Sequence, residues 1–339
     1  MDAQKPDVPP AAASNSVRAG VQRWFDVQTL SLQARYRRIE NSAGVVTTNH
    51  MQDSLTIRAR IKFDKAGRYT LNFNEATGPS FTAAWNNVGW GRGVPRVTGM
   101  FLKQLFLAAA PVKGLELSYG SLGFVRGEST EITTFDNDGY MAGARVSVKR
   151  PKDLFFDDVT FSEGYVGDVT TPGFTDRSSR LADFNYWHLL AAKKVGKALG
   201  WSADYTEWQS AGTLRGAVNL KTPRAHVVDF VRYEQYWRVN HDPYYGFAAY
   251  TEKAITRRVT AGGGYADIDA NYGGLNADRF NKGRRFFALA SVKVFQDLTA
   301  STFLSRAVHN SFAVPNNRRI DFVVAYNALG PLQRAGLFR

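Results

Sequence analysis

The residues with the clearest chemical meaning are basic side chains at alternate positions within residues 53–75. Arg58, Arg60 and Lys62 alternate there with aliphatic residues. Period-two alternation places neighbouring side chains on opposite faces of a β-strand. One face of this strand is therefore apolar and the other is strongly cationic. A row of guanidinium and ammonium groups attracts anions, so this face is a candidate anion-binding or anion-conducting surface.

The same alternation extends the basic face along the chain. The side chains that we assign to it as candidate pore-lining residues are Arg35, Arg58, Arg60, Lys62, Arg145, Lys149 and Arg215. Few carboxylates share these positions, and rings of Arg and Lys line anion-conducting pores. The alternative is that basic residues near a membrane rim bind lipopolysaccharide phosphates or snorkel. Arg58 and Arg60 stand in mid-strand, where a lipid-facing charge costs about 2–4 kcal/mol, which favours the pore interpretation.

Acidic side chains gather in two further segments. The first, 125–139, contains Glu128, Glu131, Asp136 and Asp138. The second has oxygen ligands at alternate positions, as calcium loops do: Asp267, Asp269, Asn271 and, further on, Asp278. Its glycine comes one position later than an EF-hand requires. A structural calcium is thus a hypothesis for this segment. Residues 136–139 are a shorter version of the same pattern, with a tight turn as the alternative.

No catalytic constellation accompanies these charges. The five histidines are scattered, and the chain has no HExxH, GxSxG or phosphate-binding GK[ST] pattern. The net charge of +13 indicates anionic partners, but no helical DNA-binding motif supports nucleic acid as one of them. We therefore predict a protein that is not an enzyme and has no cofactor apart from the hypothetical calcium.

The elements that position these residues are short amphipathic strands. Alternating apolar sets recur almost to the end of the chain and begin at Leu30, Leu55, Tyr69, Ala144, Leu214, Phe286 and Ile320. No run of 18 apolar residues exists, which excludes helical membrane spans but not the half-apolar strands of a barrel. The chain has no cysteine, and its 15 Tyr, 23 Phe and 7 Trp suit the aromatic girdles of a membrane barrel.

The connections between these strands alternate in length. Short turns are expected at 64–67, 111–114, 150–157, 196–200, 222–226, 253–257 and 296–298. Longer segments are expected between them at 38–52, 77–97, 125–139, 168–182, 207–212, 240–244, 268–283 and 309–318. Short turns at one rim and long loops at the other are typical of outer-membrane barrels. The count predicts an all-β, antiparallel, up-and-down transmembrane barrel of about sixteen strands, wide enough for an aqueous channel.

In strand number, loop rhythm and length the chain resembles the general bacterial porins. Residues 103–107 and 114–120 also resemble strand pairs of porin-like barrels. The resemblance implies that the third long loop, 125–139, folds into the lumen, so that its carboxylates face the basic wall and narrow the pore. It also implies a homotrimer latched by the second loop, 77–97. One departure is at the C-terminus, where Phe338 is penultimate and Gly330–Pro331 interrupts the last strand.

We divide the chain into a flexible lead-in, residues 1–20, and a barrel, residues 21–339. Residues 1–6 lack the apolar core of an export signal, so a secreted barrel requires one that is not part of this sequence. The predicted function is an outer-membrane porin for the passive diffusion of small hydrophilic solutes, with anion preference, among lipid and lipopolysaccharide. The alternatives are a non-conducting barrel that anchors a multiprotein complex and a soluble all-β carbohydrate-binding protein.

Overall fold

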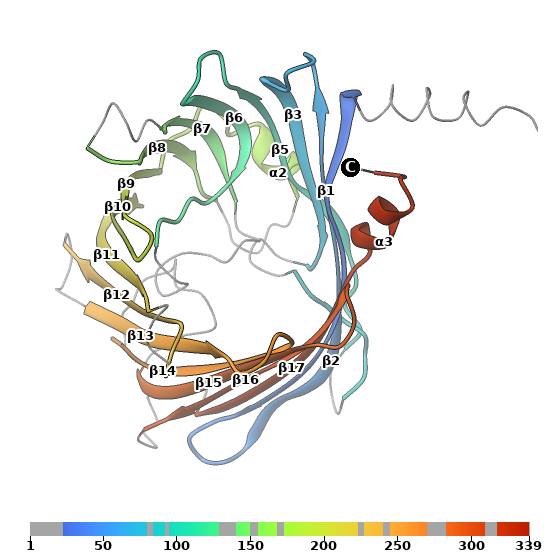
Figure 1. Ribbon diagram of the computed structural model, residues 1–339, viewed down its shortest axis with the longest axis vertical. Helices are drawn as coiled ribbons and strands as arrows, with labels where there is room; N and C mark the ends of the chain where they lie inside the picture. The colour runs from blue at the N-terminus through green and yellow to red at the C-terminus, as the bar shows by residue number, and fades with distance from the viewer. Residues whose placement is uncertain are drawn as a thin grey trace, which may run out of the picture.

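The protein is a single wide β-barrel, as the computed structural model in Figure 1 shows. The structure describes residues 23–79, 84–91, 95–128, 140–149, 155–167, 173–222, 227–239, 245–269, 283–308 and 317–338. The predicted lead-in, 1–20, therefore lies outside the described residues.

Seventeen strands form one sheet in the described part of the chain. In chain order they are β1 (Phe25–Glu40), β2 (Val46–Lys62), β3 (Tyr69–Thr77), β4 (Asn86–Asn87), β5 (Met100–Ala109), β6 (Leu115–Gly123), β7 (Tyr140–Val148), β8 (Asp158–Tyr165), β9 (Tyr186–Val195), β10 (Leu199–Trp208), β11 (Ala211–Lys221), β12 (Phe230–Arg238), β13 (Tyr245–Ala254), β14 (Val259–Ile268), β15 (Gly283–Lys293), β16 (Leu298–Ala307) and β17 (Arg318–Asn327).

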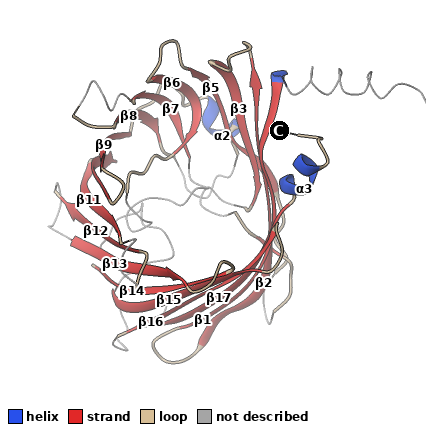
Figure 2. Ribbon diagram, viewed as in Figure 1, coloured by secondary structure: helices blue, strands red, loops and turns tan. Residues whose placement is uncertain are grey.

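The sheet closes because β1 pairs with both β2 and β17. Every pairing is antiparallel. Strands pair with their neighbours in the chain except at the closure and around β4, which is only two residues long and adds to β2 while β3 pairs with β5. Without β4, sixteen strands make the barrel wall, so the predicted all-β antiparallel barrel is confirmed. Figure 2 shows how little helix accompanies these strands.

The apolar side chains of the strands point outward. Leu32, Leu214, Phe286 and Phe322 belong to the predicted apolar sets, and between 41% and 62% of each is exposed. The basic residues at alternate positions face the interior, for example Arg35 and Arg58 on an interior cavity. Large apolar side chains exposed around a closed barrel have no core to enter, so the fitting environment is a lipid bilayer.

The short turns predicted at 64–67, 111–114, 196–200, 253–257 and 296–298 occur between consecutive strands as expected, and those at 150–157 and 222–226 lie largely outside the described residues. Two predicted long segments are wrong. Residues 38–52 lie mostly in β1 and β2, which are 16 and 17 residues long and leave only 41–45 as a turn. Segment 207–212 contains a two-residue turn, because Gln209 and Ser210 both adopt positive φ, at 51° and 65°. Positive φ at both central residues matches the twist of a tight hairpin.

Two short helices lie beside the barrel: α2 (Thr175–Ser178) and α3 (Leu329–Arg334). None of the described helices has the length and hydropathy to cross a membrane. The last strand ends at Asn327, before the Gly330–Pro331 pair, and α3 then lies outside the wall next to β1 (Figure 1). Leu329 of α3 packs there with Val27 and Ala59, and all three side chains are at least 91% buried.

Candidate functional site in the barrel lumen

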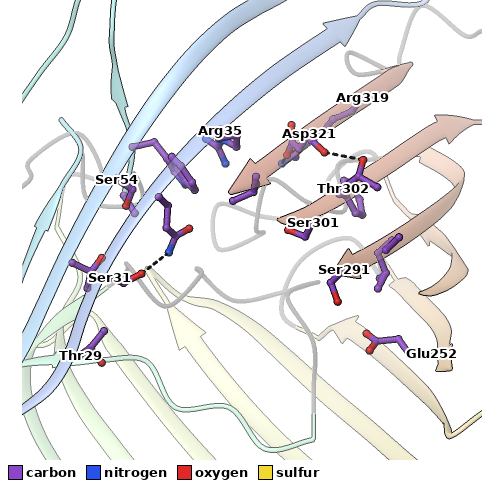
Figure 3. A pocket seen from close by; sticks show the side chains of 18 of the residues that line it. Thr29, Ser31, Arg35, Ser54, Glu252, Ser291, Ser301, Thr302, Arg319 and Asp321 are labelled. Carbon is purple, nitrogen blue, oxygen red and sulfur yellow. Dashed lines mark hydrogen bonds and ion pairs between the residues drawn. The ribbon is translucent and has the colours of Figure 1, made fainter. Parts of the chain in front are cut away.

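A cavity with a polar lining lies against the inner face of the barrel wall. It has a volume of about 600 Å³ and lies in the concave inner face of five consecutive strands of the wall, β15, β16, β17, β1 and β2 (Figure 3). Two predicted pore-lining residues, Arg35 and Arg58, face this cavity. The bulge in β1 between Val27 and Thr29 sets the parity that turns Thr29, Ser31 and Arg35 inward.

The Arg35 guanidinium is held in a fixed orientation. Its Nε and Nη2 atoms donate to Gln52 Oε1, at 2.9 and 2.6 Å, and its Cζ lies 4.1 Å from the centre of the Trp85 ring. Gln52 in turn donates to Asn87 Oδ1 of β4, at 3.0 Å. The second long loop therefore folds back onto its own barrel and holds a cation and an indole at the cavity.

A cluster of three charged side chains lies in the same wall. Asp321 of β17 accepts from Arg37 Nε at 2.9 Å and from Arg319 Nη2 at 2.5 Å. Two guanidinium groups against one carboxylate leave this trio with a net positive charge. In a partly desolvated wall such charge-assisted bonds are strong and well oriented.

Arg58 contrasts with its neighbours because its charge is not neutralised by a described carboxylate. Its Nε atom is buried and has no hydrogen-bond partner among the described residues. Across the strand, Thr29 is its register partner in β1, which offers a hydroxyl but no charge. Arg58 is therefore the predicted pore-lining residue whose positive charge is best placed to attract an anion.

A second lumen cavity of about 410 Å³ lies toward the short-turn rim. Arg60, Arg145 and Lys149 line it, as predicted for pore-lining residues. Their charges are partly compensated, since Arg60 pairs with Asp26 at 2.7 Å and Lys149 with Glu116 at 2.6 Å. Lys62, 3.9 Å from the same Asp26 carboxylate, belongs to this end of the barrel as well.

The third long loop begins inside the barrel. The Phe124 ring meets Tyr186 of β9 edge-on, with 5.3 Å between the centroids. Further along, the Glu128 backbone N–H donates to Ser202 Oγ of β10 at 2.7 Å, and Glu128 Oε2 accepts from Asn219 of β11 at 3.1 Å. Residues 124–128 thus cross from the end of β6 to the inner faces of β9, β10 and β11.

The wall that this segment covers contains a buried ion pair. Arg215 is only 1% exposed, and its Nε atom donates to Asp204 Oδ1 at 2.6 Å. His188, also 1% exposed, lies 3.3 Å from the same carboxylate. Arg215 therefore faces inward as predicted, but its charge is neutralised and covered, and it does not face the open lumen.

Several predicted site residues lie outside the described part of the chain: Glu131, Asp136 and Asp138 of the third loop, and Asn271 and Asp278 of the hypothetical calcium site. Of the remaining calcium candidates, Asp267 accepts from Arg284 Nε at 3.1 Å. No group of three or more metal-binding side chains occurs among the described residues.

Sequence reasoning missed the residues that complete the larger cavity. Trp85 is in a loop, so it does not follow from alternation, whereas Arg319 is the second residue of β17 and shares the parity of Asp321. Asp321 does alternate with Ile320 and Phe322, and its inward parity could have identified it. Its pairing with Arg37, 284 residues away, depends on barrel closure, which no local pattern reveals.

The fold is shared with porins. OprB from Pseudomonas putida aligns with a TM-score of 0.55 and 14% identity over 93% of this chain and 97% of OprB. OmpF from Salmonella typhi, solved in complex with daunomycin, aligns with a TM-score of 0.56 and 10% identity over 91% and 98%. Variants of the Rh. blastica porin align over 89% of this chain at 12% identity, one with a TM-score of 0.53. No family model matches the sequence, and no curated protein matches it.

Proposed function

We propose that this chain is an outer-membrane porin, a passive diffusion channel for small hydrophilic solutes with anion preference. The observation that supports it most is the cavity lined by Arg35 and Arg58 inside a closed barrel whose outer face is apolar. A lipid-facing exterior and a polar lumen are the two properties that a diffusion channel requires. The porin fold of the solved neighbours agrees with this proposal.

Anion preference follows from which lumen charges lack a counter-charge. Arg215, Arg60 and Lys149 each have a carboxylate partner, so they contribute little net field. Arg58 faces the cavity with the hydroxyl of Thr29 opposite it, and no described carboxylate is paired with it. A fixed charge acts over a Debye length of about 8 Å at physiological salt, which is comparable to the radius of a narrowed pore.

The constriction also belongs to this proposal. Glu128 already reaches the inner wall, so the carboxylates that follow it in the sequence would be carried into the lumen opposite β1 and β2. Carboxylates facing arginines across a narrow gap would orient dipolar solutes. The homotrimer latched by the second loop, 77–97, stays a prediction. Within the described part of this loop, Asn86 and Asn87 pair with β2 of the same chain.

The test is the reversal potential of the protein in planar bilayers across a salt gradient. The unmodified channel is expected to favour anions, and Arg58→Glu should shift the reversal potential toward cations. Arg257→Glu, the same charge change in an exposed turn between β13 and β14, is the matched control and should have no effect.

Discrete current steps with cation preference, or no response to Arg58→Glu, would contradict the proposed anion preference. The proposal that the protein is a channel would still stand. A complete absence of current would instead favour the second candidate, a plugged barrel with a scaffold role. The inward course of residues 124–128 is the observation that makes this second candidate worth testing.

A further inference from the structure

We infer that the cavity lined by β1, β2 and β15–β17 is a binding site for a hydroxylated organic anion of the sugar-acid type. This inference rests on the proposed channel function and specifies the solute that the channel would hold. The cavity volume, about 600 Å³, is within the range of about 300–1,000 Å³ that is usual for small-molecule sites.

The charge of the cavity selects an anion. Four arginines, Arg35, Arg37, Arg58 and Arg319, meet two carboxylates, Asp321 and Glu252, in or beside its wall. Asp321 is already engaged by two of the arginines. Figure 3 shows Glu252 near Ser291, away from Arg35, so a carboxylate of a solute can meet Arg35 and Arg58 without facing Glu252.

The neutral residues of the cavity favour a solute that carries hydroxyl groups. Hydroxyls line the cavity at half-buried positions: Thr29, Ser31 and Thr56 on β1 and β2, and Ser291 and Ser301 on β15 and β16. Each of these groups both donates and accepts a hydrogen bond. Inorganic anions use only the donors, whereas a polyhydroxy solute also satisfies the acceptors.

The aromatic residues argue against an aromatic acid as the solute. Each of the two rings that line the cavity already has a guanidinium group over its face. Arg35 Cζ lies 4.1 Å from the Trp85 ring centre, and Arg319 Cζ lies 5.4 Å from that of Phe303. These contacts fix the positions of the cations and leave less free ring surface for stacking.

The probe is D-glucuronate, compared with D-glucose, benzoate and chloride. Titration into single channels should produce brief partial closures with glucuronate, and the same titration by calorimetry in detergent measures binding independently of conduction. Glucose lacks the charge and benzoate lacks the hydroxyls, so each should bind about tenfold or more weakly, the effect of losing one charged hydrogen bond.

Two variants test the residues. Arg58→Gln should weaken glucuronate binding by about tenfold, and the paired change Ser291→Ala with Ser301→Ala should weaken it by a similar factor while leaving benzoate binding unchanged. Arg257→Gln is the control and should bind like the unmodified protein.

Benzoate or chloride binding as tightly as glucuronate, or tight binding of glucuronate by Arg58→Gln, would overturn the inference. An anion-selective channel that neither binds glucuronate nor closes in its presence would overturn the inference alone and leave the proposed function standing. Calorimetric binding without any current would support the site but contradict the channel.

Discussion

Two walls of this barrel have the same alternating sequence pattern but differ in what covers their inner and outer faces. The wall formed by β1 and β2 borders the lumen cavity on its inner face, and on its outer face Leu329 of α3 packs on Ala59 while Leu32 is exposed. The wall formed by β9, β10 and β11 is covered inside by residues 124–128 and presents exposed apolar side chains outside, such as Leu189 and Leu214.

The difference decides what an inward arginine does. Arg58 and Arg215 occupy equivalent places in their strands, in the middle and on the polar face. Arg58 borders a cavity, whereas Arg215 is 1% exposed and bound to Asp204. An arginine in an open wall sets the electrostatic potential of the lumen, while one in a covered wall holds the wall together. The following predictions test this distinction.

The largest expected effect is on the covered wall. Asp204→Ala leaves Arg215 buried without its counter-charge and should lower the free energy of unfolding by about 3–5 kcal/mol, as measured by urea titration in lipid vesicles. Replacing both residues by apolar ones should cost much less than this single change. Arg58→Ala in the open wall should be tolerated, and equal losses for Asp204→Ala and Arg58→Ala would remove the distinction.

The next effect compares the two faces of one strand. Phe322 of β17 faces outward and is 48% exposed, while its neighbour Val323 borders the lumen cavity. Phe322→Arg places a charge in lipid and should cost about 2–4 kcal/mol of folding free energy. Val323→Arg is the matched control, with its charge in water, and should cost far less in the same titration. A reversed order would mean that the faces are assigned the wrong way round.

The sequence alone predicts the barrel because period-two alternation is local. Residues such as Leu32, Phe286 and Phe322 identify the outer face within each strand, and turn spacing gives the strand number. The errors at 38–52 and 207–212 have a local cause too. Polar residues there extend strands beyond the membrane or form a tight hairpin, and polarity alone resembles a loop.

The candidate site is less predictable from the sequence, because its contacts join residues that are far apart in the chain. Alternation places Arg58 and Arg215 on the same face but cannot show that residues 124–128 cover only one of them. The Arg37–Asp321 pair forms across the barrel closure, between the first and last strands. Trp85 reaches Arg35 only because β4 adds to β2, and a two-residue strand has no detectable period.

A smaller effect is expected at the contact between the third loop and the covered wall. Ser202→Ala removes the hydroxyl that accepts from the Glu128 backbone N–H, a contribution of about 1 kcal/mol. The loop should then move more freely, and single-channel records in potassium chloride should show more fluctuations between conductance levels. Ser31→Ala in the open wall lacks any described loop contact and serves as the control. Identical noise in the two variants would show that the loop start does not limit the current.

The smallest effect concerns the outer support of the open wall. Arg334 of α3 pairs with Asp297 in the turn between β15 and β16, and the hydrogen bond from Arg334 lowers the pKa of Asp297 below its usual value. A carboxyl whose pKa is lowered by folding stabilises the folded state above its unfolded pKa. It loses that contribution as the pH falls through the folded pKa.

Hydrogen exchange of residues 329–338, corrected for intrinsic rates, should therefore show a better-protected tail at pH 7 than near pH 3. Asp297→Asn should remove most of this pH dependence, because the amide stays neutral throughout. Asp183→Asn, which disrupts the separate pair with Arg180, should leave the exchange of α3 unchanged. A tail that exchanges equally fast at both pH values in the unmodified protein would show that this ion pair does not hold α3 against the wall.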